Sequence, residues 1–360
     1  MAKQNGKAEP KSEKKKLRIG IIGAGGIAGT HTDHYKKMED VEIVAASDVS
    51  EASLKKYSEK YGINKTHTDW KAMLSENKLD AVSVCTPNGL HMAAAVDALN
   101  AGCNVLVEKP LAMNAVEGQK MLDAAKKNKK LLVIGFQYRY DVRSRILRKA
   151  VEDGFFGKIM FVRVQALRRR GIPNWGVFGR KELQGGGPLI DIGVHALEMA
   201  HFVIGSPEPI AASGNVWTYM GNKPTDMHWC WWPNWDYKTY NVEDFAAGSI
   251  RTKAGTIIHI ESSFAAHIEK DIFSFTIAGE KGGATWEPFG LYYDQAGMML
   301  NATPHYVPKE DAFWLKMRNF ADACLYEKET QAPAEHGLMV QKMLDGIYAS
   351  AAAGKEVKIE

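Results

Sequence analysis

The stretch Leu17-Arg-Ile-Gly-Ile-Ile-Gly-Ala-Gly-Gly-Ile-Ala28 decides the fold of the first part of this 360-residue chain. Its first six residues have the composition of a buried strand. The pattern Gly23-x-Gly25-x-x-Ala28 follows, and a helical pattern then runs to about residue 37. A strand, a glycine turn and a helix in this order form the dinucleotide-binding fingerprint, here with alanine as its third small residue. The glycines permit a tight turn and a close approach of backbone to a pyrophosphate, while Ala28 lets helix and strand pack closely.

An acidic residue at the end of the second predicted strand indicates which dinucleotide is bound. Asp48 lies 20 residues beyond Ala28 and follows the strand 41–47. A carboxylate at this position binds the hydroxyls of the adenine ribose and repels a ribose phosphate. We therefore expect NAD rather than NADP. The alternative is that Asp48 only caps the following helix.

The pattern of elements predicts an α/β chain with two domains. Buried strands at 81–85, 104–107 and 131–136 alternate with helices, which predicts a doubly wound parallel sheet and a Rossmann domain over residues 17–137. Residues 138–360 show strands joined by short turns, which favour antiparallel pairing in a large open sheet. We interpret these residues as a second domain, of the α+β class. Its predicted strands and helices cover residues 141–153, 158–167, 189–204, 210–219, 242–252, 256–265, 272–278, 312–326 and 335–353.

Charge and cysteine content exclude several classes of function. The net charge of +4 is carried by residues 1–16, which hold six lysines and two glutamates, and the rest of the chain is neutral. A short basic tail on a neutral body predicts a disordered segment and no nucleic-acid partner. Apolar runs are too short to span a membrane, and no secretory signal is recognisable. The scattered cysteines predict reduced thiols in a cytoplasmic protein; they are Cys85, Cys103, Cys230 and Cys324.

Two short motifs follow strands of the predicted parallel sheet. Thr86-Pro87-Asn88 follows the strand 81–85, and Glu108-Lys109-Pro110 follows the strand 104–107. Ligands of such sheets bind at the carboxyl ends of the strands. Lys109 would there hydrogen-bond the reacting oxygen of a substrate and stabilise a developing alkoxide. Asn88 is also a candidate helix N-cap, and the two roles are compatible.

Asp191 and His195 are four residues apart on a predicted helix, which places them on one face. Glycines 185–187 and Pro188 precede them and fit a tight turn before a helix start. Histidine is the side chain best matched to accept a hydroxyl proton near neutral pH. The alternatives are a buried structural histidine and a metal site with His201. The metal reading lacks a third ligand at a supporting spacing, so we expect no metal.

Taken together, these motifs resemble those of the Gfo/Idh/MocA oxidoreductases, from residue 17 to the carboxyl terminus. The matching stretches are 23–28, 86–88 with His91, 108–110, 135–139 and 185–195. The resemblance implies that Lys109, Asp191 and His195 are catalytic. Ala28 in place of glycine is a permitted variant. The predicted cofactor contacts are Gly23, Gly25, Gly26, Ile27, Asp48, Thr86, Pro87, Asn88, His91, Glu108, Lys109 and Gln137.

The resemblance implies oxidation of a secondary hydroxyl of a sugar, glycoside or polyol by hydride transfer to NAD, at C3 of the sugar by analogy with relatives. It also implies a homodimer or homotetramer formed through the second sheet. We predict substrate contacts from Arg168, Trp175, Asp191 and His195. Residues 217–240, the aromatic segment, hold five of nine tryptophans and are interpreted as a substrate lid or an oligomer contact. Two alternatives stay open: a glycosidase-like enzyme that oxidises, eliminates and re-reduces with retained NAD, and a non-enzymatic sensor of sugar or NAD.

Overall fold

The computed structural model describes residues 16–225 and 230–359. The prediction of a disordered basic tail therefore lies, except for Lys16, outside the described residues. Trp229 of the aromatic segment also lies outside them. In the described part, no helix has the length and apolar character needed to cross a membrane.

The first sheet has six parallel strands, so all of their carboxyl ends lie at one edge. This confirms the predicted Rossmann arrangement, and the buried apolar strands explain it, because both faces of the sheet are covered by helices. In spatial order the strands are β3 (Thr66–His67), β2 (Val41–Ser47), β1 (Leu17–Ile22), β4 (Ala81–Val84), β5 (Asn104–Val107) and β6 (Leu132–Ile134).

Helices cover both faces of the first sheet. One face carries α3 (Trp70–Glu76), α4 (His91–Asn100) and α5 (Ala115–Asn128). The other carries α1 (Gly26–Tyr35), α2 (Glu51–Tyr61) and α9 (Ala312–Tyr326), of which α9 comes from the far end of the chain. Two 3-10 turns, η1 (Asn88–Leu90) and η2 (Gln137–Tyr140), follow strands at the carboxyl edge.

The second sheet has nine strands, and all neighbours are antiparallel except β7 and β10. Its inner face packs against α8 (Val194–Val203) and α10 (Ala334–Ala353), and α6 (Val142–Glu152) packs against α8. The short helix α7 (Lys181–Gln184) and the π-helical turn η3 (Leu189–Gly193) precede α8. In spatial order the strands are β14 (Met298–Ala302), β13 (Gly290–Gln295), β12 (Gly282–Thr285), β11 (Ile272–Gly279), β7 (Ile159–Leu167), β10 (Ile257–Ser263), β9 (Phe245–Thr252), β8 (Pro209–Trp217) and β15 (Val357–Lys358).

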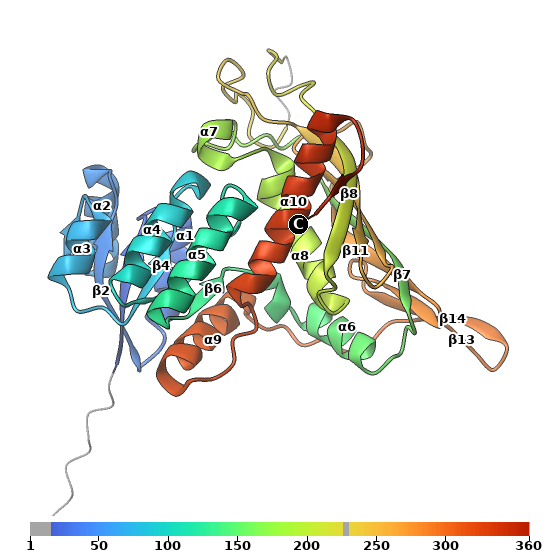
Figure 1. Ribbon diagram of the computed structural model, residues 1–360, viewed down its shortest axis with the longest axis horizontal. Helices are drawn as coiled ribbons and strands as arrows, with labels where there is room; N and C mark the ends of the chain where they lie inside the picture. Colours follow the sequence, from blue (N-terminus) through green and yellow to red (C-terminus); the bar gives the residue numbers. More distant parts are fainter. Residues whose placement is uncertain (1–15, 226–229, 360) are drawn as a thin grey trace, which may run out of the picture.

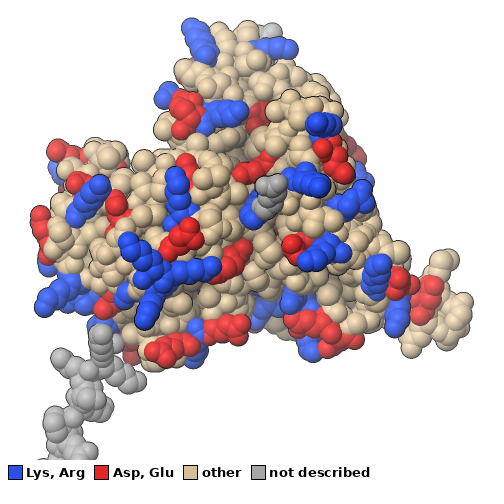
Figure 2. Space-filling model, in the orientation of Figure 1, with Lys and Arg blue, Asp and Glu red and all other residues tan. Residues whose placement is uncertain are grey.

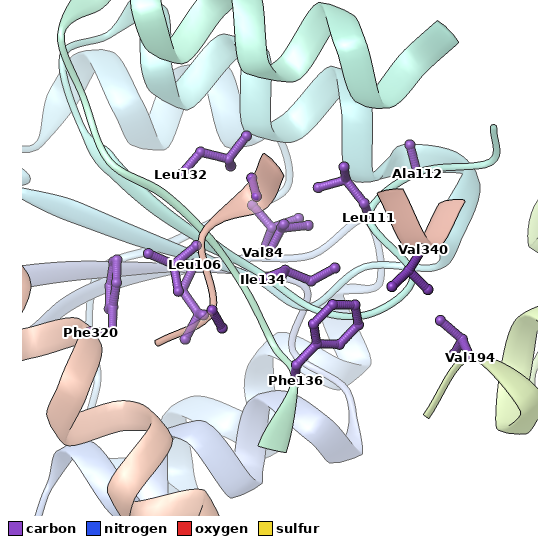
Figure 3. Packing of buried hydrophobic residues seen from close by; sticks show 14 of the residues in the cluster. Val84, Leu106, Leu111, Ala112, Leu132, Ile134, Phe136, Val194, Phe320 and Val340 are labelled. Carbon is purple, nitrogen blue, oxygen red and sulfur yellow. The ribbon is translucent and has the colours of Figure 1, made fainter. Parts of the chain in front are cut away.

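Helix α10 joins the two sheets. It contacts α5 and β6 on one side and β8 and β9 on the other, and it runs between the two halves in Figure 1. Figure 3 shows Val340 of α10 and Val194 at the start of α8 beside Ile134 and Phe136 of the first sheet's edge. These residues belong to one continuous buried cluster that also includes Ile260 of the second sheet. The two sheets are therefore held in a fixed relation. The exact boundary between residues 137 and 138 stays a prediction.

The surface carries both signs of charge. Figure 2 shows basic and acidic side chains interspersed over the visible face of both halves. Mixed charge of this kind is typical of a solvated surface rather than of a surface that binds nucleic acid.

Candidate active site

The glycine turn after β1 forms a cradle at the carboxyl edge of the first sheet. Gly23 has a φ of +92°, and a Cβ there would lie 2.6 Å from the carbonyl oxygen of Cys85, so the position requires glycine. At Gly25 and Gly26, in contrast, no atom lies within 4 Å of an added Cβ. Helix α1 also begins without a side-chain cap. Open space and uncapped backbone amides fit the pyrophosphate of a dinucleotide.

Asp48 fixes the shape of this turn. Its Oδ2 accepts a hydrogen bond from the amide of Ala24 at 2.7 Å, and its Oδ1 accepts one from the amide of Ser50 at 2.8 Å. Ser50, rather than Asp48, is the N-cap of α2, because its hydroxyl accepts from the amide of Ser53. The carboxylate therefore connects the glycine turn to the start of α2, at the edge where the predicted ribose contact lies.

Nine buried side-chain polar atoms have no hydrogen-bond partner among the described residues, and two of them belong to residues predicted to contact the cofactor at the carboxyl edge. These two atoms are Oγ1 of Thr86 and Oε1 of Gln137. A buried polar atom without a partner costs free energy, so such atoms mark places where a ligand completes the network. Both belong to the predicted cofactor contacts. Together with the open glycine turn, they fit NAD.

Asn88 and His91 connect the turns around this edge. The side-chain nitrogen of Asn88 donates a hydrogen bond of 3.0 Å to the backbone carbonyl oxygen of Gln184, and this bond joins η1 to α7. The two ring nitrogens of His91 lie 2.7 Å from the carbonyl oxygen of Pro110 and 3.0 Å from that of Thr86. Burial lowers the pKa of His91. The neutral ring donates to one of these carbonyl oxygens at a time. Its position between them holds together the two turns that carry Thr86 and Lys109.

Glu108 lies beneath the site in a buried network that the sequence did not predict. Its Oε1 accepts hydrogen bonds from Nζ of Lys316 at 2.6 Å and from Nε2 of His31 at 2.9 Å. Burial opposes the charge on Glu108, but Lys316 and the hydrogen bond from His31 outweigh it and hold its pKa well below the ordinary value. Burial and the charge of Lys316 lower the pKa of His31 to about 4, so His31 is a neutral donor here.

Lys109 is held by the segment that carries Asp191. Its Nζ lies 2.9 Å from Oδ1 of Asp191 and 3.0 Å from the backbone oxygen of the same residue. Both side chains are mostly buried, with exposed fractions of 19% and 14%. Burial acts to raise the pKa of Asp191, but the charge of Lys109 outweighs this effect and lowers it. The ammonium group is thus fixed in place with N–H directions left for a ligand.

His195 lies one helical turn after Asp191, as the spacing predicts, and lines the same cavity. Burial and the nearby charge of Lys109 lower its pKa to about 3, which leaves the imidazole neutral at physiological pH. Nδ1 of His195 lies 3.5 Å from the side-chain nitrogen of Gln137, and Tyr138 packs edge-on against the ring. The helix that carries Asp191 and His195 begins as the π-helical turn η3, a distortion frequent at functional sites.

These groups line a cavity of about 620 Å³, the central cavity. All four predicted substrate contacts lie in its wall: Arg168, Trp175, Asp191 and His195. The guanidinium of Arg168 stacks 5.0 Å from the ring centre of Trp232, and Trp175 meets the same ring edge-on at 4.4 Å. A larger hollow of about 990 Å³ lies near Arg18 and Arg318 at the amino ends of the strands and contains no predicted site residue.

The aromatic segment divides into parts with different environments. Trp231 and Trp232 line the central cavity. Trp235 and Tyr240 are buried in a small separate cluster with Phe264. Trp217 is 44% exposed on β8. Within the described residues the segment is therefore neither wholly a lid nor wholly a surface contact.

Two consecutive carboxylates hold the walls of the central cavity in place. Glu243 accepts hydrogen bonds from the amides of Gly187 and Leu189 and from the hydroxyl of Tyr348, at the start of the helix that carries Asp191. A Cβ at Gly187 would lie 2.0 Å from the carbonyl oxygen of Glu243, which explains why glycine precedes this helix.

The neighbouring residue, Asp244, anchors the aromatic segment. It is fully buried and accepts hydrogen bonds from three consecutive amides, those of Tyr219, Met220 and Gly221. The start of the helix that carries Asp191 and the base of the aromatic segment are thus both fixed by the two residues that precede β9.

Comparison with known proteins identifies the chain's relatives. The NAD-binding Rossmann-fold model of the GFO/IDH/MocA oxidoreductases matches residues 17–136, and the model of their carboxyl-terminal domain matches residues 144–285. D-glucoside 3-dehydrogenase of Escherichia coli (strain K12) is 37% identical over 95% of this chain and 97% of its own length. Myo-inositol 2-dehydrogenase of Thermotoga maritima is 32% identical over 56% of this chain and 59% of its own.

Solved structures show the same fold. Levoglucosan dehydrogenase in complex with NADH and levoglucosan superposes with a TM-score of 0.83 at 22% identity, covering 96% of this chain and all of the other. Aldose-aldose oxidoreductase of Caulobacter crescentus gives a TM-score of 0.79 at 24% identity, with the same coverage.

Glu243→Ala tests the anchoring of the helix. The substitution leaves two buried amides and the Tyr348 hydroxyl without their acceptor, so we expect the free energy of unfolding to fall by about 2–4 kcal/mol. Urea denaturation measures the change. Glu208→Ala, at an exposed ion pair with Lys253, is the matched control and should cost less than about 0.5 kcal/mol. Equal losses in the two variants would refute the anchoring role.

Proposed function

Because the chain belongs to the Gfo/Idh/MocA family of NAD-binding oxidoreductases, we propose that it oxidises the C3 hydroxyl of a D-glucoside with Lys109, Asp191 and His195 as its catalytic residues. One observation carries this proposal. The ion pair between Lys109 and Asp191 and the neutral ring of His195 line one cavity beside the carboxyl edge of the Rossmann sheet. Bound NAD supplies the hydride acceptor.

Lys109 positions and polarises the hydroxyl that reacts. Asp191 holds the ammonium group through two oxygens, so the group is oriented before substrate binds. Its free N–H donates to the substrate oxygen. The positive charge then stabilises the alkoxide character that develops as the C–H bond breaks.

His195 accepts the hydroxyl proton. Its lowered pKa keeps the ring neutral, so one ring nitrogen carries a lone pair. The oxygen and nitrogen of the Gln137 amide exchange places on a flip. In the flipped amide the oxygen accepts from N–H at Nδ1 of His195, and the NH2 group takes the buried position that has no partner among the described residues, where it can donate to the cofactor. Nε2 is then the acceptor that faces the substrate.

A glucoside fits the composition of the central cavity. Lys109, Asp191 and His195 offer polar groups to a hydroxyl, while Trp175 and Trp232 offer aromatic surface to the apolar face of a pyranose ring. The D-glucoside 3-dehydrogenase relative, which this chain matches over nearly its whole length, supports both the substrate class and the carbon oxidised.

The proposal extends to assembly through the outer face of the second sheet, as a homodimer or homotetramer. Helices α8 and α10, which contact this sheet, lie on its other face in Figure 1. Phe161 and Trp217, exposed by 40% and 44%, lie on strands β7 and β8. Exposed aromatic side chains are frequent anchors of protein interfaces. The cytoplasmic location stays a prediction.

The substrate proposal is tested by incubating the purified protein with NAD and a panel of methyl glucosides, free sugars and inositols. NADH is followed by absorbance and products by mass spectrometry. We expect NADH and a 3-keto-glucoside from the glucosides. Altered sugar without net NADH would replace the proposal with chemistry on retained NAD. NAD binding without any product would favour a sensor.

Lys109→Met tests the role of the ammonium group. It keeps the length of the side chain but removes the charge and its donors, so we expect turnover to fall by at least about a thousandfold. NAD binding, measured by calorimetry, should change by less than about tenfold. Turnover within tenfold of wild type would overturn the assignment of Lys109.

The pH dependence of kcat/KM tests the state of His195. A proton acceptor must be neutral, and the pKa of about 3 keeps His195 neutral throughout the range in which an ordinary histidine titrates. We therefore expect no loss of kcat/KM centred near the ordinary histidine pKa of about 6.5. Circular dichroism at each pH confirms that the fold is intact. A fall in kcat/KM centred near that pH, while the protein stays folded, would contradict the lowered pKa of His195.

A further inference from the structure

A second cavity adjoins the central one. This side cavity has a volume of about 490 Å³, and its wall includes Arg169, Arg170 and His267. Trp231 and Asp271 line both cavities. The two cavities are therefore neighbours, and Trp231 and Asp271 lie at their common border.

The polar groups of the side cavity are mainly donors. Arg169 donates through Nη1 to the carbonyl oxygen of Glu269, and Arg170 donates through Nη1 to those of Arg169 and Ala266. Among the described residues, Nε and Nη2 of Arg169 and Nε of Arg170 have no partner. Guanidinium groups with free donors bind carboxylate and phosphate oxygens.

His267 adds a further donor. Nη2 of Arg170 lies 3.1 Å from Nε2 of His267, which therefore accepts and places the ring proton on Nδ1. The one acidic residue in the described wall, Asp271, already accepts a hydrogen bond of 2.7 Å from the backbone amide of Arg169. The two guanidinium charges thus exceed the single carboxylate.

The two cavities differ in what they offer to a ligand. The central cavity holds the residues assigned to hydride transfer, and the side cavity holds none of them. Trp231, which is 64% exposed, stands at the border with its aromatic surface available. A ligand that spans both cavities thus presents a sugar hydroxyl on one side, an apolar or ring portion at Trp231, and an anionic group on the other.

We propose that the side cavity is an aglycone subsite that selects glucosides whose aglycone carries a carboxylate or phosphate. The inference rests on the proposed function, because it assumes that the glucose ring occupies the central cavity. Trp231 covers the linking part of the aglycone, and Arg169 and Arg170 bind its anionic group.

The test compares kcat/KM for methyl, phenyl and 4-carboxyphenyl D-glucosides of one anomeric configuration. The phenyl and carboxyphenyl compounds differ only by the carboxylate group. We expect wild-type enzyme to prefer the carboxyphenyl glucoside about fivefold at low ionic strength, and the preference to shrink at about 0.5 M salt. A D-glucoside whose phenyl aglycone carries a phosphate in place of the carboxylate shows which of the two anions the enzyme prefers.

Three variants make the test specific. Arg169→Gln combined with Arg170→Gln should bring the ratio of carboxyphenyl to phenyl kcat/KM to about one. Asp271→Asn, which removes the opposing charge, should raise that ratio. Arg251→Gln is the matched control, because this arginine is paired with Glu356 and lines neither cavity. Thermal denaturation of each variant verifies folding.

Failure of the subsite and failure of the proposed function give different outcomes. Turnover of the methyl glucoside with equal rates for the two aryl glucosides, or a preference that the double variant retains, overturns the subsite and leaves the proposed function standing. Failure to oxidise any of the glucosides, the methyl compound included, overturns the proposed function and the subsite with it.

Discussion

The ion pair between Lys109 and Asp191 is the interaction on which the site depends, because it joins two segments that are packed against different sheets. Lys109 follows β5 of the first sheet, and Asp191 lies in η3, which packs against β10 of the second. Both side chains are largely withdrawn from water, so loss of either partner leaves a charge in an environment that solvates it poorly. The packing of the two halves therefore also places Lys109 beside Asp191, and α10, which contacts both sheets, holds the halves together.

Each partner of this ion pair must be held in place, and on each side a buried carboxylate fixes the neighbouring backbone. On the Rossmann side, Glu108 is fixed by Lys316 and His31 directly before Lys109. On the other side, Glu243 fixes the amides at the start of the helix that carries Asp191. Buried carboxylates are costly unless every oxygen is satisfied, and each of these accepts from two or more donors. Among the buried polar atoms that have no partner within the described residues, those of Thr86 and Gln137 lie at the edge where NAD is expected.

The sequence predicted the fold class, and the structure confirms both the parallel first sheet and the mostly antiparallel second one. Local sequence patterns were enough to predict β1, the glycine turn and the helix that follows. They were also enough to place Asp191 and His195 on one face, because the two residues are one helical turn apart. Strands β13 and β14 were not predicted, since their exposed residues, such as Tyr292 and Met299, lack an alternating apolar face. Lys316 was missed for another reason: it lies 208 residues from Glu108, and only the packing of α9 brings it there. A lysine in the apolar stretch Phe-Trp-Leu-Lys-Met was the available signal, because a buried lysine needs a carboxylate.

The central cavity combines two kinds of surface that few small substrates match at once. Lys109, Asp191 and His195 present charge and hydrogen-bonding groups to the cavity, and Trp175 and Trp232 present aromatic rings to it. A pyranose has hydroxyls around its rim and C–H groups on its face, so it satisfies both kinds of surface without leaving a buried polar group unpaired. A sensor would need only this complementarity. A positioned ammonium group beside a histidine held neutral serves proton and hydride transfer, and binding alone does not require it. The electrostatics of the cavity therefore favour catalysis over recognition alone.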